Sequence, residues 1–190
     1  MIQTLNNMVI GIIGKIGSGK SKCLKFIEEL YIDYDIKIYS CDDIAKEILD
    51  EDDSKFTFKY LRPYDFFTNE KIQEEVRNDF HPLVFNKIKE EIDASSKDSI
   101  NLIETALPSE LFLNMCDKTI YIKSSREDEM GRLKNSRSFT DEQFNVIYNS
   151  QEYYEKYYNK ADYIIENNGD LDSFKCKIKE VMDEICIICK

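Results

Sequence analysis

The segment MVIGIIGKIGSGKS, at residues 8–21, contains the pattern that indicates the fold class of this chain. Its first six residues form an apolar run, which is typical of a buried strand in a parallel sheet. Four of the six glycines in the chain fall at Gly11, Gly14, Gly17 and Gly19. Glycine is costly in regular structure, so this crowding predicts an unusual backbone path. Apolar side chains then recur at helical spacing over residues 21–30 and predict a helix.

Residues 14–21 match the pattern G-x-x-x-x-G-K-[ST] between this predicted strand and helix, which is the context that gives the pattern meaning. Small residues let the loop wrap a phosphate, and backbone N–H groups and the helix N-terminus attract its charge. Lys20 is expected to reach the β- and γ-phosphates of ATP, and the Ser21 hydroxyl to complete the shell of Mg²⁺. A glycine-rich turn without function is the weaker alternative. The residues expected to contact the nucleotide are Gly14, Lys15, Ile16, Gly17, Ser18, Gly19, Lys20, Ser21 and Lys22.

The same alternation of strand and helix continues along the chain. Further helices are expected at 42–49, 109–115, 126–135, 141–159 and 170–189. Alternating strands and helices predict a parallel sheet with right-handed crossovers. We therefore expect an α/β fold of three layers, with a five-stranded parallel sheet. The predicted strands are 8–13, 36–39, 99–103, 119–122 and 163–165.

Residues 50–95 interrupt this pattern, since they show no clear strand. They are expected to form a helical insertion with pieces at 56–61, 69–78 and 82–92. The chain is then a single domain over 1–190, with its core in 8–49 and 97–190 and a mobile lid at about 124–140. In kinases of small metabolites such an insertion commonly holds the acceptor.

Composition excludes several classes of protein. The net charge of −11 argues against nucleic-acid binding, which selects basic surfaces. The chain has no apolar run of the roughly 20 residues that a membrane span needs. The N-terminus lacks the features of a signal peptide, and the six cysteines are scattered, so we expect free thiols and a cytoplasmic protein. The pair Cys186 and Cys189 is interpreted as part of an apolar helix rather than as a metal or redox site.

Asp42 follows the second predicted strand, at the sheet edge where ligands bind in such folds. A carboxylate there can accept the proton of an attacking hydroxyl, so Asp42 is a candidate catalytic and substrate-binding residue. The alternative is that Asp42 caps the following helix. Asp43 is expected to be that cap or to be solvated.

A basic segment spans residues 118–137, with six basic and three acidic side chains in an otherwise acidic chain. Its arginines are Arg126, Arg132 and Arg137, and arginines on a lid can stabilise a phosphoryl group in transfer. A solvated helix with i,i+4 ion pairs is the alternative. His81, the only histidine, precedes Pro82 at the start of a predicted helix. It is expected either to contact an anionic acceptor or to cap that helix.

With these residues placed, the chain resembles the dephospho-coenzyme A kinase family from about residue 9 to 175. The P-loop is similar to that family's opening motif, and SCDDIAK at 40–46 is similar to its D-A-D-x-I-A-R. FHP at 80–82 is similar to its L-H-P, and 104–110 falls where the family has D-x-P-L-L-x-E. Gln151 and ADYIIENNG at 161–169 are similar to its Q…A-D-x-V-I-x-N-x-G.

The resemblance implies a reaction. MgATP binds the loop, and the 3′-hydroxyl of dephospho-CoA attacks the γ-phosphate. Asp42 accepts the proton or orients the hydroxyl, while Lys20, Mg²⁺, Arg132 and Arg137 stabilise charge and His81 contacts the acceptor. The small-molecule acceptor is the expected partner, without nucleic acid or membrane, and the chain is expected to be a monomer or a small homo-oligomer.

The chain departs from the family pattern at several positions. Lys15 replaces a glycine and adds a cation beside the phosphates, and Ser40 replaces the first aspartate of D-A-D. Ala106 replaces a proline, and Ser136 displaces the second lid arginine by one position. Lys22 stands where a small residue is common.

Two other functions stay open at this point. A nucleoside or deoxynucleoside monophosphate kinase shares the loop, the acid, the insertion and the lid. A non-catalytic nucleotide-binding module is suggested by the departures at Ser40 and Lys15. The tyrosines between 148 and 158 could form a partner surface for such a module, or they could pack on the sheet.

Overall fold

The computed structural model describes residues 7–51, 67–96, 98–137 and 140–188. It contains one sheet in the order β2-β3-β1-β4-β5, and every neighbouring pair is parallel. The predicted five-stranded parallel sheet is thereby confirmed. The strands are β1 (Met8–Ile13), β2 (Asp35–Ser40), β3 (Ser99–Thr105), β4 (Lys118–Lys123) and β5 (Tyr163–Glu166).

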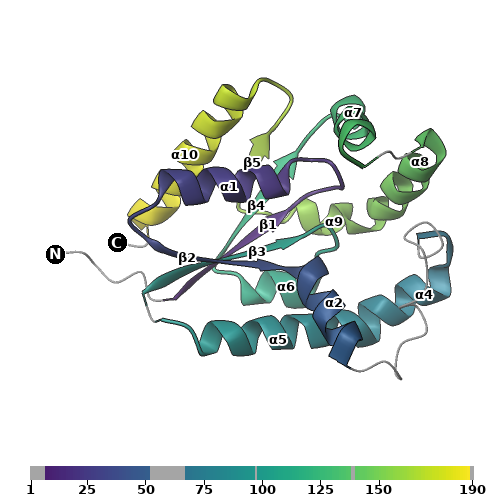
Figure 1. The fold of residues 1–190 in the computed structure, drawn as a ribbon, viewed down its shortest axis with the longest axis horizontal. Helices are drawn as coiled ribbons and strands as arrows, with labels where there is room; N and C mark the ends of the chain where they lie inside the picture. Colours follow the sequence, from purple (N-terminus) through teal and green to yellow (C-terminus); the bar gives the residue numbers. More distant parts are fainter. Residues whose placement is uncertain (1–6, 52–66, 97, 138–139, 189–190) are drawn as a thin grey trace.

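The sheet is the middle of three layers (Figure 1). On one face, α1 (Lys20–Leu30) and α10 (Leu171–Ile188) pack over β1, β3 and β4 with a core that includes Ile27, Phe174 and Ile178. On the other face lie α2 (Cys41–Glu51), α5 (His81–Asp93), α6 (Glu110–Met115) and α9 (Glu155–Tyr158). Because β1 and β3 are covered on both faces, nearly all of their residues are buried. β1 is apolar throughout, whereas β3 also buries the polar residues Ser99, Asn101 and Thr105.

The helical insertion between β2 and β3 is confirmed for the part that the structure describes. After α2 it contains α4 (Glu70–Glu75), a π-helical turn η2 (Val76–Phe80) and α5. The two predicted pieces at 69–78 and 82–92 join end to end, with Pro82 in the first turn of α5 as expected. The predicted piece at 56–61 lies outside the described residues.

The long helix predicted over 141–159 is wrong. The chain forms α8 (Asp141–Ser150), a 3₁₀ turn η3 (Gln151–Tyr154) and then α9. The Ser150 hydroxyl donates to the Ile147 carbonyl at 2.7 Å, and Gln151 is turned inward and buried. A tightened turn of this kind follows when side-chain contacts outweigh the helical ladder.

The tyrosines of this segment mostly pack inward. Tyr154 and Tyr158 are buried, and the ring of Tyr158 stacks on Tyr121 of β4 with centroids 4.9 Å apart. Tyr153 remains 46% exposed. The interpretation that part of this face packs on the sheet is confirmed.

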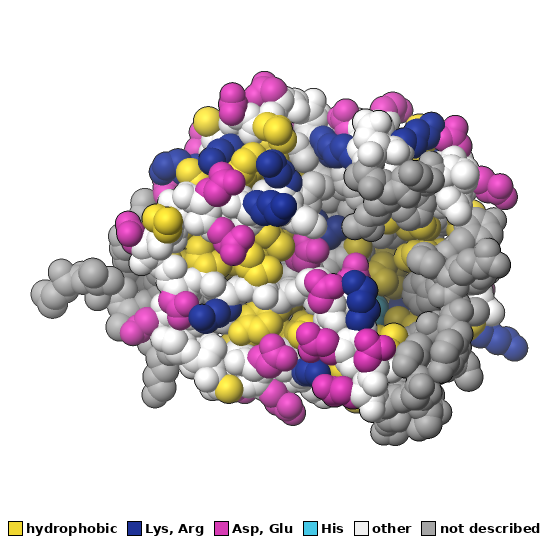
Figure 2. Space-filling model, viewed as in Figure 1, with side chains coloured by type: hydrophobic (Ala, Val, Ile, Leu, Met, Phe, Trp, Pro, Cys, Tyr) yellow, Lys and Arg dark blue, Asp and Glu magenta, His cyan; other side chains and the backbone are white. Residues whose placement is uncertain are grey.

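The surface is mixed in charge. On the face shown in Figure 2, lysine and arginine side chains alternate with aspartate and glutamate. None of the helices described is both long and apolar enough to cross a membrane. The described cysteines, from Cys23 to Cys186, are free thiols, and Cys189 lies outside the described residues.

The ring of Phe112 on α6 fixes the packing of this layer, because it is fully buried against Phe85 and lies over Gly11. We expect Phe112→Ala to lower the free energy of unfolding by about 3–5 kcal/mol in urea denaturation, since it removes an aromatic ring from the core. Leu111→Ala is the control, because Leu111 is 42% exposed on the same helix. It should cost less than about 1 kcal/mol, and equal losses would contradict this account of the core.

Candidate active site

The glycine-rich loop, Gly14–Ser21, leaves β1 and enters α1 through two positions that only glycine fits. Gly17 has φ +79° and Gly19 has φ +109°, both in the left-handed region. A Cβ on Gly17 would lie 2.7 Å from the Glu129 carbonyl oxygen, and one on Gly19 would lie 2.3 Å from Asn167 Nδ2. The loop is thus held tightly between α7 (Arg126–Arg137) and the end of β5.

Lys20 provides the positive centre of this loop. Its ammonium donates to the carbonyl oxygens of Gly14, at 3.0 Å, and Lys15, at 3.3 Å. Lys20 is also the first residue of α1, whose first N–H groups have no partner within the helix. An ammonium and a helix N-terminus in one loop form a site for phosphate groups.

Glu104 is a functional candidate that the sequence interpretation did not single out. It lies near the end of β3, level with Ile12 of β1 and Ser40 of β2. The Ser21 hydroxyl lies 3.3 and 3.4 Å from the two oxygens of its carboxylate. Burial raises the pKa of Glu104, and the charge of Asp42 adds to this, while Lys20 opposes it. The only sequence signal for a role of Glu104 was its position as an acid at the end of the third strand, in the segment 104–110 that resembles a family motif.

Asp42 lies in the first turn of α2, next to the end of β2, and is exposed. Of the two roles expected for Asp43, helix capping is wrong and solvation is confirmed, since its side chain is 67% exposed. The hydroxyl of Ser40 accepts from the Asp43 N–H at 3.2 Å and takes the capping position, while Asp43 pairs with Lys46 at 2.8 Å. Asp42 therefore does not cap the helix. Together with Glu104, Asp42 borders the loop at the carboxyl edge of the sheet.

The donors at this edge suit a hard divalent cation bound together with phosphates. Ser21 and Glu104 supply oxygen atoms, and Mg²⁺ is usually held by one or two carboxylates plus substrate phosphates. Within the described residues, no cluster of three or more acidic, histidine or cysteine side chains could hold a metal alone. The site therefore fits Mg²⁺ that arrives with a nucleotide.

Lys15 does not project freely toward the loop, in contrast to the expectation of an added cation beside the phosphates. It is almost fully buried, and its ammonium forms an ion pair with Glu155 at 2.9 Å and lies 4.1 Å from the centre of the Tyr148 ring. Burial by itself lowers the pKa of Lys15, but the hydrogen bond to Glu155 and the charges of Tyr148 and Glu155 leave it raised. Lys15 therefore links the loop to α8 and α9.

A second link joins the loop to the same segment. The side-chain oxygen of Gln151, which is 1% exposed, accepts from the Ile16 N–H at 2.9 Å. This contact explains why Gln151 turns inward at the break between α8 and α9.

Arg132 reaches the loop from α7. Its guanidinium donates to the carbonyl oxygens of Gly17 at 3.1 Å and Ser18 at 3.3 Å, and to that of Asn167 at 2.6 Å. The Asn167 side chain in turn donates to the Ser18 carbonyl at 2.8 Å. Arg132 thus joins α7, β5 and the loop. The side chain of Arg137 lies outside the described part of the structure.

The two remaining candidates have less direct positions. The ammonium of Lys22 lies over the Phe26 ring, 4.7 Å from its centre. His81 begins α5 beside Phe85, and burial, with a smaller contribution from the charge of Arg77, lowers the pKa of His81 to about 4. His81 is therefore neutral at pH 7, so its side chain can form hydrogen bonds but carries no charge.

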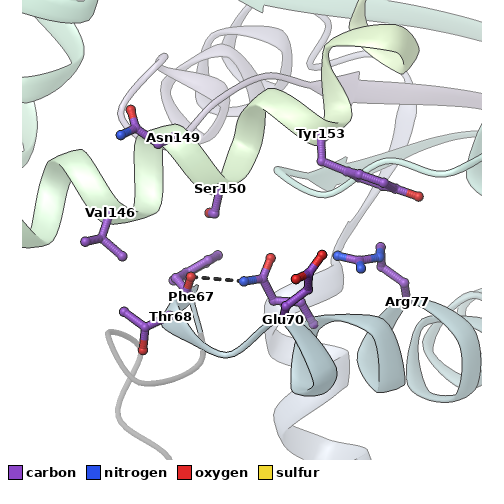
Figure 3. Close-up of a pocket in the computed structure, with 9 residues that line it drawn as sticks. Phe67, Thr68, Glu70, Arg77, Val146, Asn149, Ser150 and Tyr153 are labelled. Atoms are coloured by element: carbon purple, nitrogen blue, oxygen red, sulfur yellow. Dashed lines mark hydrogen bonds between the residues drawn. The ribbon is translucent and has the colours of Figure 1, made fainter.

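A cavity of about 480 Å³ lies between the insertion and the α8–η3 segment (Figure 3). Arg77 projects into it, and its guanidinium lies over the Tyr153 ring, 4.5 Å from the ring centre. Gln73 also lines the cavity and donates to the Phe67 carbonyl at 2.9 Å. The cavity therefore combines the Arg77 cation, the Glu70 carboxylate, an aromatic face and amide groups.

The contact between Gln151 and the loop can be tested directly. Gln151→Leu keeps the volume but leaves the Ile16 N–H without its acceptor, so we expect a loss of about 1–3 kcal/mol in the free energy of unfolding, together with weaker ATP binding. Denaturation and calorimetric titration measure the two effects. Glu152→Gln, at an exposed neighbour, should change neither, and an unaltered Gln151→Leu variant would contradict the proposed link.

Comparison with known proteins agrees with this geometry. A family model described as dephospho-CoA kinase matches residues 59–173. A dephospho-CoA kinase of Fusobacterium nucleatum subsp. nucleatum is 29% identical over 94% of this chain and 98% of its own length.

Two solved structures share the fold. One is a dephospho-CoA kinase from Campylobacter jejuni, with TM-score 0.59 and 25% identity over 94% of this chain and 96% of that one. The other is TT1252 from Thermus thermophilus, with TM-score 0.68 and 20% identity over 94% and 97% of the two chains. The family match begins after the glycine-rich loop, so the loop and Asp42 are separate evidence. This chain belongs to the dephospho-CoA kinase family.

Proposed function

We propose that this chain transfers the γ-phosphoryl group of ATP to the 3′-hydroxyl of dephospho-CoA, which gives coenzyme A in the final step of its synthesis. One observation carries the proposal. In a chain of this family, the loop with Lys20 meets Glu104 and Asp42 at the carboxyl ends of three adjacent strands. Phosphoryl transfer depends mostly on positioning and on charge stabilisation, and this edge supplies both.

The loop Gly14–Ser21 would bind the β- and γ-phosphates through its N–H groups and through Lys20. The present contacts of Lys20 with loop carbonyls at 3.0 and 3.3 Å hold its ammonium at the loop. Arg132, and Arg137 with it, would stabilise charge on the transferring group. For Arg132 this requires release of some of its bonds to the loop carbonyls, which is the motion we assign to a lid of about residues 124–140.

Asp42 would accept the proton of the 3′-hydroxyl or orient that hydroxyl. Its position at the start of α2, exposed and beside the loop, allows an acceptor to reach it. Ser21 and Glu104 would hold Mg²⁺ together with the phosphates. When bound, Mg²⁺ neutralises charge on the β- and γ-phosphates.

The acceptor would bind on the insertion, of about residues 50–95. The cavity beside it offers Arg77 to an anionic group and the Tyr153 ring to a flat one, and neutral His81 adds a hydrogen-bonding group next to Arg77. We further propose one domain over 1–190, a cytoplasmic location, and a monomer or small homo-oligomer. The free thiols in the described residues suit a reducing compartment, and size-exclusion chromatography with light scattering measures the oligomeric state.

The activity is tested by mixing purified protein with MgATP and dephospho-CoA and following ADP and CoA together. We expect both products to rise in step. ADP release with a nucleoside monophosphate, and no CoA, would contradict the proposal in favour of a monophosphate kinase. Tight ATP binding without turnover of any acceptor would contradict it in favour of a non-catalytic module.

The role of Asp42 is tested by Asp42→Asn. We expect turnover to fall at least ~100-fold, which is the scale of losing a general base, while ATP binding stays close to that of the natural chain. Asp43→Asn is the matched control, because Asp43 is the adjacent acid and pairs with Lys46. It should retain most of the activity, and equal turnover in the two variants would remove Asp42 from the mechanism.

A further inference from the structure

Glu129 on α7 is a buried acid that the proposed mechanism does not use. Glu129 is only 2% exposed, and its Oε2 atom has no hydrogen-bond partner. A buried carboxylate without full hydrogen bonding is costly, so such a group calls for an explanation.

The position of Glu129 relates it to the phosphate site. Its backbone carbonyl is the atom that excludes a Cβ at Gly17, so this turn of α7 lies directly against the loop. One turn further along α7, Arg132 donates to the Gly17 and Ser18 carbonyls. Glu129 therefore lies within the part of α7 that is fixed to the nucleotide loop.

The charges around Glu129 come from several elements. Lys15 and Lys20 of the loop and Arg132 of α7 favour its ionised form, and Asp128 of α7 opposes it. Tyr121 of β4 and Tyr158 of α9 also interact with its charge. Burial outweighs the three cations and raises the pKa of Glu129 to about 7.

We propose that Glu129 is a further residue of the nucleotide site, which takes up one proton from solvent as a polyphosphate binds to the loop. The proposal rests on the nucleotide site of the proposed function. Without nucleotide, the three cations keep much of the carboxylate ionised. A bound polyphosphate takes over their positive charge and adds its own negative charge nearby, so the carboxylate becomes the neutral acid.

The direction of the pH dependence follows. Because the nucleotide raises the proton affinity of Glu129, binding is strongest when Glu129 is already protonated. Nucleotide affinity should therefore fall as the pH rises through 7.

The test is calorimetric titration with a non-hydrolysable ATP analogue and saturating Mg²⁺, without acceptor, in two buffers of different protonation enthalpy at pH 7.5. We expect the natural chain to take up roughly half a proton or more per nucleotide, relative to Glu129→Gln. The dissociation constant of the natural chain should rise about fivefold or more from pH 6.5 to 8.5, relative to that variant. Protonation of the analogue itself cancels in the comparison.

Glu127→Gln is the matched control, since Glu127 is an exposed acid in the same first turn of α7. It should behave like the natural chain. Equal proton uptake by the natural chain and Glu129→Gln would overturn the proposal. If Glu129→Gln did not fold, the ionisation of the analogue would be measured separately and subtracted, and an affinity of the natural chain that then stayed constant between pH 6.5 and 8.5 would overturn the proposal as well.

The titration and the kinase assay can fail independently of each other. Kinase activity with proton uptake that does not depend on Glu129 contradicts this inference alone. Uptake that depends on Glu129, in a protein without dephospho-CoA kinase activity, supports the inference and contradicts the function. A chain that binds no analogue contradicts both.

Discussion

The structure depends on one steric constraint, the close approach of other elements to Gly17 and Gly19. The Glu129 carbonyl and the Asn167 amide occupy the space where side chains at these two positions would lie. Only a loop without side chains at these two positions can be enclosed so closely from outside. This explains why Arg132 of α7 and Asn167, directly after β5, reach the same eight-residue loop although they are far apart in sequence.

The loop is also an electrostatic centre in which each cation has an acid nearby. Lys15 pairs with Glu155, while Lys20 lowers the pKa of Glu104 and of Glu129 against the effect of burial. A cluster of unbalanced cations would repel itself before a phosphate arrived. In the empty site, the acids offset the repulsion between the cations. When a phosphate binds, the negative charges of the acids must themselves be compensated.

Local patterns predicted the parts of the molecule that local physics determines. The strands and the loop follow from apolar runs, glycine spacing and Lys20. Each of these signals lies within a sequence window of about fifteen residues. The contacts Lys15–Glu155 and Ile16–Gln151 join residues 140 and 135 positions apart, and no periodicity reports them. The break of the helix at Gln151 depends on such a contact and was missed for that reason. The cap by Ser40 is a local contact with the Asp43 N–H, and it was missed because serine and aspartate are both favoured at that position. Glu104 and Glu129 were missed because nothing in the identity of an acid indicates that it is buried.

These features explain how a chain of net charge −11 can bind a polyanion. At physiological ionic strength, charges separated by more than about 8 Å of solvent are largely screened, so the exposed acids contribute little at the loop. Nucleotide binding depends instead on the balance of positive and negative charges buried around the loop, where screening by salt is weak. The negative charges of the two nearby acids would be compensated in different ways. A metal ion at the exposed edge of the sheet would compensate Glu104, and a proton would neutralise Glu129 on α7. If both proposals hold, an acidic protein of this design would bind nucleotide together with cations, and its affinity would depend on metal and proton concentrations more than on its net charge.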